Sequence, residues 1–193
     1  MKKYICLLFI FVVLAGCGNS GDDIKIQEGY DRISNDRIVF FLSYLDFESR
    51  YFCGYFVDSH GSKHYYEIQD TDIPDYSDEF VYSFLCEHSA EFQGEEFLSQ
   101  EAVDRCYAYL TRVDENAEII QETEPVYDAA GVTLIGVRVK NGVEELVPIR
   151  ENSSLSWIST DEYTKKIIEV FGEDQWFVER KMYVESNSSE ELQ

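Results

Sequence analysis

Runs of alternating apolar residues predict strands in the first part of the chain. Residues 37–45, 50–58 and 63–68 are rich in Phe, Tyr, Val and Ile, the composition typical of strands. The last two runs are separated by residues 58–62, in which Gly61 allows a tight turn. These segments therefore predict a meander of antiparallel strands.

Two helices are predicted next. Ser77 can cap a helix whose apolar positions are spaced three and four residues apart. A second helix should begin at Ser99 and carry Val103, Cys106 and Leu110 on one face. We expect both helices to cover the same face of the sheet, which would bury their apolar sides.

The second half of the chain contains the clearest turn. Residues 132–140 and 143–149 flank Asn141-Gly142, a pair that favours the positive φ angles of a type I′ hairpin. The acidic stretch 114–125 has one apolar pair, Ile119-Ile120, so it is either an edge strand or a connection.

A helix and a strand are predicted to complete the domain. Ser159-Thr160-Asp161-Glu162 resembles a capping box and predicts a helix that ends at Gly172. Residues 175–184 alternate as a final strand, and the polar residues 186–193 should be disordered.

The order of elements is strands, two helices, a hairpin, a helix and a final strand. This order predicts an α+β fold with one or more antiparallel sheets, rather than the regular β–α alternation of a parallel sheet. At 193 residues in total, one domain over residues 37–185 is expected. Two smaller lobes, residues 37–112 and 113–185, are the alternative.

The N-terminal residues have the layout of an export signal. Two lysines precede an unbroken apolar run from Ile5 to Leu14, which ends in Leu14-Ala15-Gly16-Cys17. A membrane-spanning helix would need about 20 apolar residues, more than this run provides. A plain secretory signal would give no reason for the cysteine.

These four residues resemble the lipobox of bacterial lipoproteins. The resemblance implies that residues 1–16 are removed and that the thiol of Cys17 carries a diacylglycerol. It also implies an exported protein anchored by this lipid to the cell membrane or the outer membrane. Residues 17–36 lack a sustained apolar pattern, so we predict a flexible tether there.

The charge of the chain limits its partners. Loss of Lys2 and Lys3 with the leader changes the formal net charge from −22 to −24. A strongly acidic surface disfavours binding to nucleic acid and to anionic lipid headgroups, both of which select Lys and Arg. A cationic protein is the macromolecular partner that this charge favours, and solubility alone is the simpler explanation of the charge.

Three cysteines remain after the leader and the acylated Cys17 are set aside. An odd number permits at most one internal disulfide, and Cys86 and Cys106 lie on the two neighbouring predicted helices. The alternative is that these two and Cys53 are buried thiols. The segment around Cys53 superficially resembles the nucleophile segment of cell-wall cysteine peptidases, but its aromatic and β-branched neighbours predict a strand instead of a helix N-terminus.

The remaining polar clusters match no known site. His60 and His64 flank a turn and lack an evident third metal ligand, and the acidic residues 70–79 do not follow the calcium-loop pattern. Fourteen tyrosines and two tryptophans would suit a binding face, although packing in the sheet explains them more simply.

We therefore predict no catalytic residue, metal site or cofactor. The sequence favours a membrane-anchored envelope lipoprotein whose domain is a non-catalytic binding module. An envelope hydrolase without a recognisable motif is the alternative.

Overall fold

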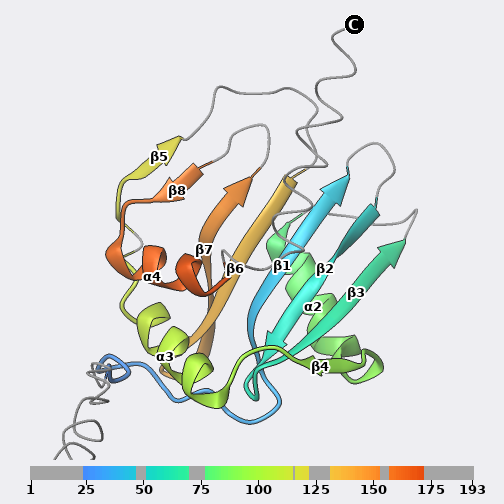
Figure 1. Ribbon diagram of the computed structural model, residues 1–193, viewed down its shortest axis with the longest axis horizontal. Coiled ribbons are helices and arrows are strands. Elements are labelled where there is room, and N and C mark those ends of the chain that lie inside the picture. Colours follow the sequence, from blue (N-terminus) through green and yellow to red (C-terminus); the bar gives the residue numbers. More distant parts are fainter. Residues whose placement is uncertain are drawn as a thin grey trace, which may run out of the picture.

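One antiparallel sheet organises the part of the chain that the structure describes. The computed structural model describes residues 24–46, 51–69, 77–114, 116–121, 131–152 and 157–171. Within these ranges eight strands are joined in the order β4-β3-β2-β1-β6-β7-β8-β5, and each neighbouring pair is antiparallel (Figure 1). The predicted α+β fold is confirmed. The leader, the predicted strand 175–184 and the tail 186–193 lie outside the described residues.

The elements follow one another in the predicted order, with short additions. The strands are β1 (Ile38–Asp46), β2 (Tyr51–Asp58), β3 (Ser62–Gln69), β4 (Gly94–Glu96), β5 (Ile119–Gln121), β6 (Gly131–Lys140), β7 (Val143–Asn152) and β8 (Trp157–Ser159). The helices are α2 (Asp78–His88), α3 (Gln100–Leu110) and α4 (Glu162–Phe171), and the 3-10 turn η1 spans Ser89–Glu91.

The predicted meander of strands and the predicted hairpin at Asn141-Gly142 are both confirmed. The meander β1-β2-β3 begins and ends within one residue of the predicted runs. Between β6 and β7, Asn141 has φ 52° and Gly142 has φ 78°, as a type I′ turn requires. Pro148 lies where the pairing of β7 with β6 shifts by one residue, and such a bulge tolerates a residue without an N–H donor.

Short strands at and next to the sheet edges were less predictable. β5 is an edge strand, which confirms one of the two alternatives for residues 114–125. β4 and β8 were not predicted. Each has only three residues, too few to show an alternating pattern.

Helix caps set the ends of the helices. Ser77 Oγ accepts a hydrogen bond from Phe80 N at 3.2 Å, and Ser99 Oγ accepts one from Ala102 N at 3.3 Å. For α4 the cap is Asp161 rather than Ser159, because Asp161 Oδ1 accepts from the backbone N–H groups of residues 163 and 164 at 2.8 and 2.9 Å.

The helices form layers on both faces of the sheet. Figure 1 shows α3 and α4 in front of the sheet and α2 behind it. The expectation that α2 and α3 share one face was wrong. Both faces of the central strands are apolar, since Phe40 and Leu42 face α3 and α4 while Phe41 contacts the α2 side. A sheet with two apolar faces needs a cover on each.

The central strands join the two halves of the chain. β1 from the first half pairs with β6 from the second over six residue pairs, from Phe40↔Gly136 to Leu45↔Gly131. Residues on both sides of position 113 therefore share one sheet, and both hydrophobic clusters contain residues from each half.

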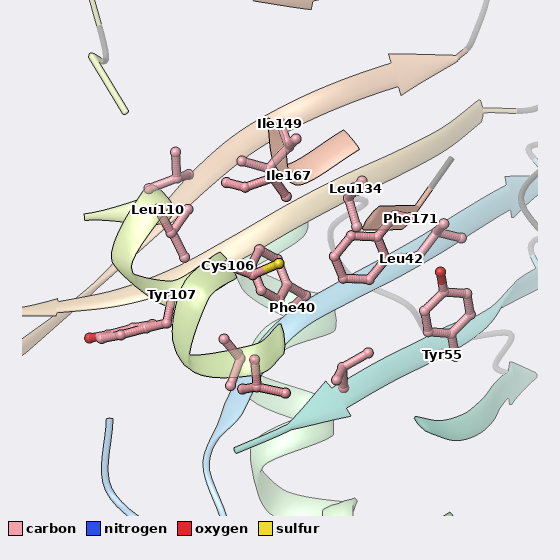
Figure 2. Close-up of a cluster of buried hydrophobic side chains, with 14 of the residues drawn as sticks. Phe40, Leu42, Tyr55, Cys106, Tyr107, Leu110, Leu134, Ile149, Ile167 and Phe171 are labelled. Carbon is pink, nitrogen blue, oxygen red and sulfur yellow. The ribbon is translucent and has the colours of Figure 1, made fainter. Parts of the chain in front are cut away.

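The larger hydrophobic cluster lies between the sheet and helices α3 and α4. In Figure 2, Phe40 and Leu42 of β1, Cys106 and Leu110 of α3, and Phe171 of α4 point into it. The rings of Phe40 and Phe171 are 5.0 Å apart. This contact ties α4 to the central strand.

Residues 24–36 pack on the domain, contrary to their prediction as part of a flexible tether. The side chains of Ile26 and Ile33 contact the larger cluster. Gln27 N donates to Thr111 Oγ1 at 3.1 Å, and Asp31 N donates to Val139 O at 2.9 Å. A few well-spaced apolar side chains were enough to dock this segment without forming a strand or helix.

A buried arginine closes the end of α3. Arg138 is 1% exposed, and its Nε donates to Glu145 Oε2 at 2.9 Å. Its Nη1 donates to the carbonyl oxygens of Leu110 and Val113 at 3.4 and 3.1 Å. A cation at the C-terminus of a helix satisfies carbonyl groups that lack intrahelical partners and interacts favourably with the helix dipole.

Candidate functional site

A bridge between Cys86 and Cys106, one of the two alternatives, is not formed. Cys53, Cys86 and Cys106 take part in no disulfide in the structure. Cys86 is exposed on α2, whereas Cys106 lies in the cluster on the opposite face of the sheet. The two helices are neighbours in sequence but not in space, which separates the sulfur atoms.

The buried thiols are packing groups. Burial raises the pKa of Cys106 to about 12, and burial also raises the pKa of Cys86. A reactive cysteine needs the opposite, a lowered pKa. Cys53 lies in the middle of β2 and is 5% exposed, as predicted for a strand residue and unlike a nucleophile at a helix N-terminus. Cys17, the predicted lipid site, is outside the described residues.

His64 lies in a compact polar network beside β4. Its Nε2 is 2.9 Å from Asp58 Oδ2, and its Nδ1 is 3.1 Å from the carbonyl oxygen of Phe92. Both partners are oxygen atoms that accept hydrogen bonds, so the two contacts fix the orientation of the ring. The ring stacks on Phe56 with centroids 4.5 Å apart. A Cβ at Gly94 would be 2.6 Å from this ring, so the close approach of β4 requires glycine there.

The other two histidines have separate partners. His60 Nε2 is 3.2 Å from Asp36 Oδ1, and His88 Nδ1 is 2.8 Å from Glu91 Oε1. His60 and His64 therefore point to different carboxylates instead of sharing one site. Within the described ranges, no three His, Cys, Asp or Glu side chains are grouped so that they could hold a metal ion.

Several exposed acidic residues lie on neighbouring elements at the β4 edge of the sheet. Residues 77–96 contain six carboxylates and no lysine or arginine. We call the exposed carboxylates on β3, α2, η1 and β4 the acidic edge; they are Glu67, Glu87, Glu91, Glu95 and Glu96. Asp78 and Glu79 lie in the first turn of α2, where the helix dipole favours them. Asp70, Asp72 and Asp75 are outside the described residues.

A groove runs between the docked N-terminal segment and α3. Its volume is about 1040 Å³, and its floor includes Tyr107 and Ala108. The lining of the groove contains two cations, Lys25 and Arg32, and two carboxylates, Glu28 and Asp104, so their formal charges cancel. The sequence did not indicate this groove, because it exists only if residues 24–35 dock.

The groove is lined by polar groups. Among the lining residues whose contacts are described, no nucleophile is paired with a base. Gln100 Nε2 donates to Ser59 O and to Asp104 Oδ1, both at 3.0 Å. His60, at its edge, is bonded to Asp36, whose side chain is 89% exposed. This arrangement offers hydrogen bonds to a ligand and lacks the enclosed, oriented acid and base of a catalytic centre.

Most described tyrosines serve packing. Tyr44, Tyr55, Tyr66 and Tyr107 are buried, and Tyr65 is 44% exposed. Burial raises the pKa of Tyr107, whose hydroxyl donates to Asp31 O at 2.9 Å and accepts from Val139 N at 3.2 Å. Figure 2 shows this hydroxyl directed away from the apolar cluster. The aromatic content therefore reflects the core more than an exposed binding face.

No helix in the described part of the chain has the length and apolar character to cross a membrane. Comparisons with protein-family models, with curated proteins and with solved structures find no match to this chain. The arguments for function therefore rest on the chemistry of the residues themselves.

Proposed function

We propose that this protein is a lipid-anchored protein of the bacterial envelope whose domain binds a cationic protein without catalysing a reaction. The anchor is the acylated Cys17 implied by the lipobox. Two acyl chains hold a protein stably at a bilayer, because each buried methylene contributes about 0.8 kcal/mol.

The acidic edge is the observation that supports the binding part of the proposal. Its five carboxylates are exposed on neighbouring elements. Carboxylates of one sign on neighbouring elements create a local field that attracts cations and raises their association rate.

The chemistry of the described side chains supports binding over hydrolysis. Cys53 is buried in mid-strand, and both ring nitrogens of His64 contact protein acceptors. Neither is arranged as an activated nucleophile or an accessible general base.

The anchor is tested by replacing Cys17 with Ser. Native protein should partition with membranes, and its N-terminal peptide should begin at an acylated cysteine. The Cys17→Ser protein should lose the acyl mass and leave the membrane fraction. A variant that stays membrane-bound with unchanged mass would refute the anchor.

Binding is tested by neutralising the acidic edge. The test variant carries four substitutions, Glu87→Gln, Glu91→Gln, Glu95→Gln and Glu96→Gln. At low salt its association rate with a fluorescent oligolysine probe should be at least about tenfold lower than that of the native protein. The same decrease is expected for basic proteins captured from the native envelope. The difference should shrink as salt rises, because exposed charges are screened over roughly 10 Å at 0.1 M.

A matched control variant distinguishes the effect of where the carboxylates lie from the effect of the net charge of the protein. Glu101→Gln, Glu118→Gln, Glu162→Gln, Glu169→Gln removes the same number of exposed carboxylates outside the acidic edge. Stopped-flow association should slow much less in this control. Equal slowing in the two variants would mean that the acidic edge is no specific binding surface.

A further inference from the structure

Helices α3 and α4 lie side by side and share a cluster of tyrosines and cations. The rings of Tyr109 and Tyr163 are 6.0 Å apart. Lys166 Nζ lies 5.5 and 5.1 Å from the two ring centroids, and Arg112 Cζ lies 5.8 Å from that of Tyr163. With Lys25, which Arg112 contacts, these five residues form what we call the cation–tyrosine cluster.

The cluster adjoins the point where the N-terminal chain attaches to the domain. Arg112 Nη2 and Nε donate to Lys25 O at 3.0 and 3.3 Å. From Cys17 to Lys25 the chain has eight residue steps, which span at most about 29 Å when fully extended. An acyl chain on Cys17 therefore keeps this part of the domain close to the bilayer surface.

The charges around the cluster differ from those of the acidic edge. Arg105 of α3 and Lys165 of α4 are exposed nearby. Four exposed carboxylates are also present, Glu101 and Asp104 on α3 and Glu162 and Glu169 on α4, while Asp161 caps α4. The acidic edge is carried by elements toward the other end of the sheet (Figure 1). Because charges are screened within about 10 Å, the local side chains decide what this surface attracts.

We propose that the cation–tyrosine cluster lies on the headgroups of the anchoring membrane, with anionic phospholipid as its partner, and that this contact turns the acidic edge toward the outside. This inference rests on the proposed function, since the acyl anchor on Cys17 supplies the proximity. Tyrosine rings favour the membrane–water interface, and Lys and Arg bind anionic headgroups. A tethered surface needs little intrinsic affinity, because the tether raises its effective concentration at the bilayer.

The test uses the acylated mature protein in vesicles of phosphatidylcholine with or without phosphatidylglycerol. A fluorophore is attached either to Cys86 on α2 or to Lys165→Cys on α4 in a Cys86→Ser background. Cys53 and Cys106 are buried, so the exposed thiol is labelled selectively. Replacing Lys165 removes a cation, so this label position works against the expected result. Quenching by a headgroup-attached quencher reports which label lies nearer the bilayer.

The label on α4 should be quenched more strongly than the label on α2, and the difference should grow with the phosphatidylglycerol content. Arg112→Gln with Lys166→Gln should lower the preference for this orientation by about fivefold per residue. The matched control is Ser83→Glu with Gln93→Glu, which changes the net charge equally at exposed positions on α2 and near β4. It should leave the quenching difference intact.

Equal quenching of the two labels on acylated, vesicle-bound protein would overturn the orientation while leaving the anchor in place. A quenching difference that survives the Arg112→Gln, Lys166→Gln double variant would overturn the role of the cluster. If the native mature protein carries no acyl group and stays in the supernatant, the proposed function and this inference are both overturned.

Discussion

The two faces of the sheet are covered by different means. On one face, α3, α4 and the docked residues 24–36 enclose a cluster of eighteen buried hydrophobic residues. On the other, α2 covers a cluster of ten. The first face also contains the buried Arg138, whereas the polar network of the second is centred on His64, which is partly exposed. Among the described residues, the first face therefore buries more apolar side chains than the second.

The elements that cover the two faces of the sheet also differ in charge. The helices of the larger cluster have both cations and carboxylates among their exposed residues, while α2 and the neighbouring β4 have carboxylates and no lysine or arginine. The same sheet thus supports a stable side near the chain entry and an acidic side away from it. Substitutions on the two sides should therefore differ in kind, with large losses of stability on the first and smaller, local effects on the second.

Arg138→Met should produce the largest loss. It removes a buried charge, and Glu145 Oε2 and the carbonyl oxygen of Val113 each lose a donor, at a cost of about 3 kcal/mol in the free energy of unfolding. Chemical denaturation would measure it. Lys140→Met, an exposed position on the same strand, is the control and should change stability by less than about 0.5 kcal/mol. Similar effects of both substitutions would mean that the buried arginine does not fasten α3.

His64→Leu should cost less and act locally. Asp58 and the carbonyl of Phe92 lose a partner in a partly buried site, which corresponds to about 1–3 kcal/mol. Hydrogen exchange should accelerate in β4 more than in β6. His60→Leu, at the exposed contact with Asp36, should have little effect. Uniform acceleration across the whole sheet would show that the network is not local to the α2 side.

Gly142→Val should destabilise the hairpin that borders the docked segment. Nothing lies within 4 Å of a Cβ at this position, so the expected cost of about 1 kcal/mol or more comes from the positive φ alone. Asn141→Gly is the control, because glycine accepts that conformation freely. An unchanged melting temperature for Gly142→Val would indicate that the turn adopts another conformation.

Alkaline pH should weaken the larger cluster slightly. The pKa of Cys106 is raised by burial to about 12 in the folded protein, so the stabilisation from its neutral thiol is complete below the unfolded pKa and is lost as pH rises toward 12. By pH 10 this loss should be about 1 kcal/mol. Cys106→Ala should flatten the slope of stability between pH 9 and 10, although it lowers the stability at neutral pH. Equal slopes in both proteins would exclude Cys106 as the source.

Local signals in the sequence predicted local structure well. Asn141-Gly142 located its hairpin, and Ser77 and Ser99 located two helix starts, because each depends on contacts within a few residues. Placement of α2 and α3 on opposite faces depends on the pairing of β1 with β6, which are far apart in sequence. The possible bridge between Cys86 and Cys106 fails for the same reason, since it required both helices to cover one face.

The candidate surfaces were only partly predictable. The acidic composition is visible in the sequence, but its segregation from the cation–tyrosine cluster depends on the sheet order. Residues 24–36 were misassigned because their apolar side chains are isolated, and isolated residues carry no periodic signal. The groove beside them followed from the same docking and was missed for the same reason.

The docked segment also sets how far the domain can reach. A force applied to the chain from its N-terminal side acts first on the hydrogen bonds of residues 25–31. These bonds join the segment to Thr111 and Arg112 at the end of α3 and to the β6–β7 hairpin, so they are loaded before any strand of the sheet. Peeling residues 25–36 away would release twelve residues, or about 40 Å of extended chain. The length of chain between Cys17 and the folded sheet can therefore more than double under load while the described strands and helices remain intact.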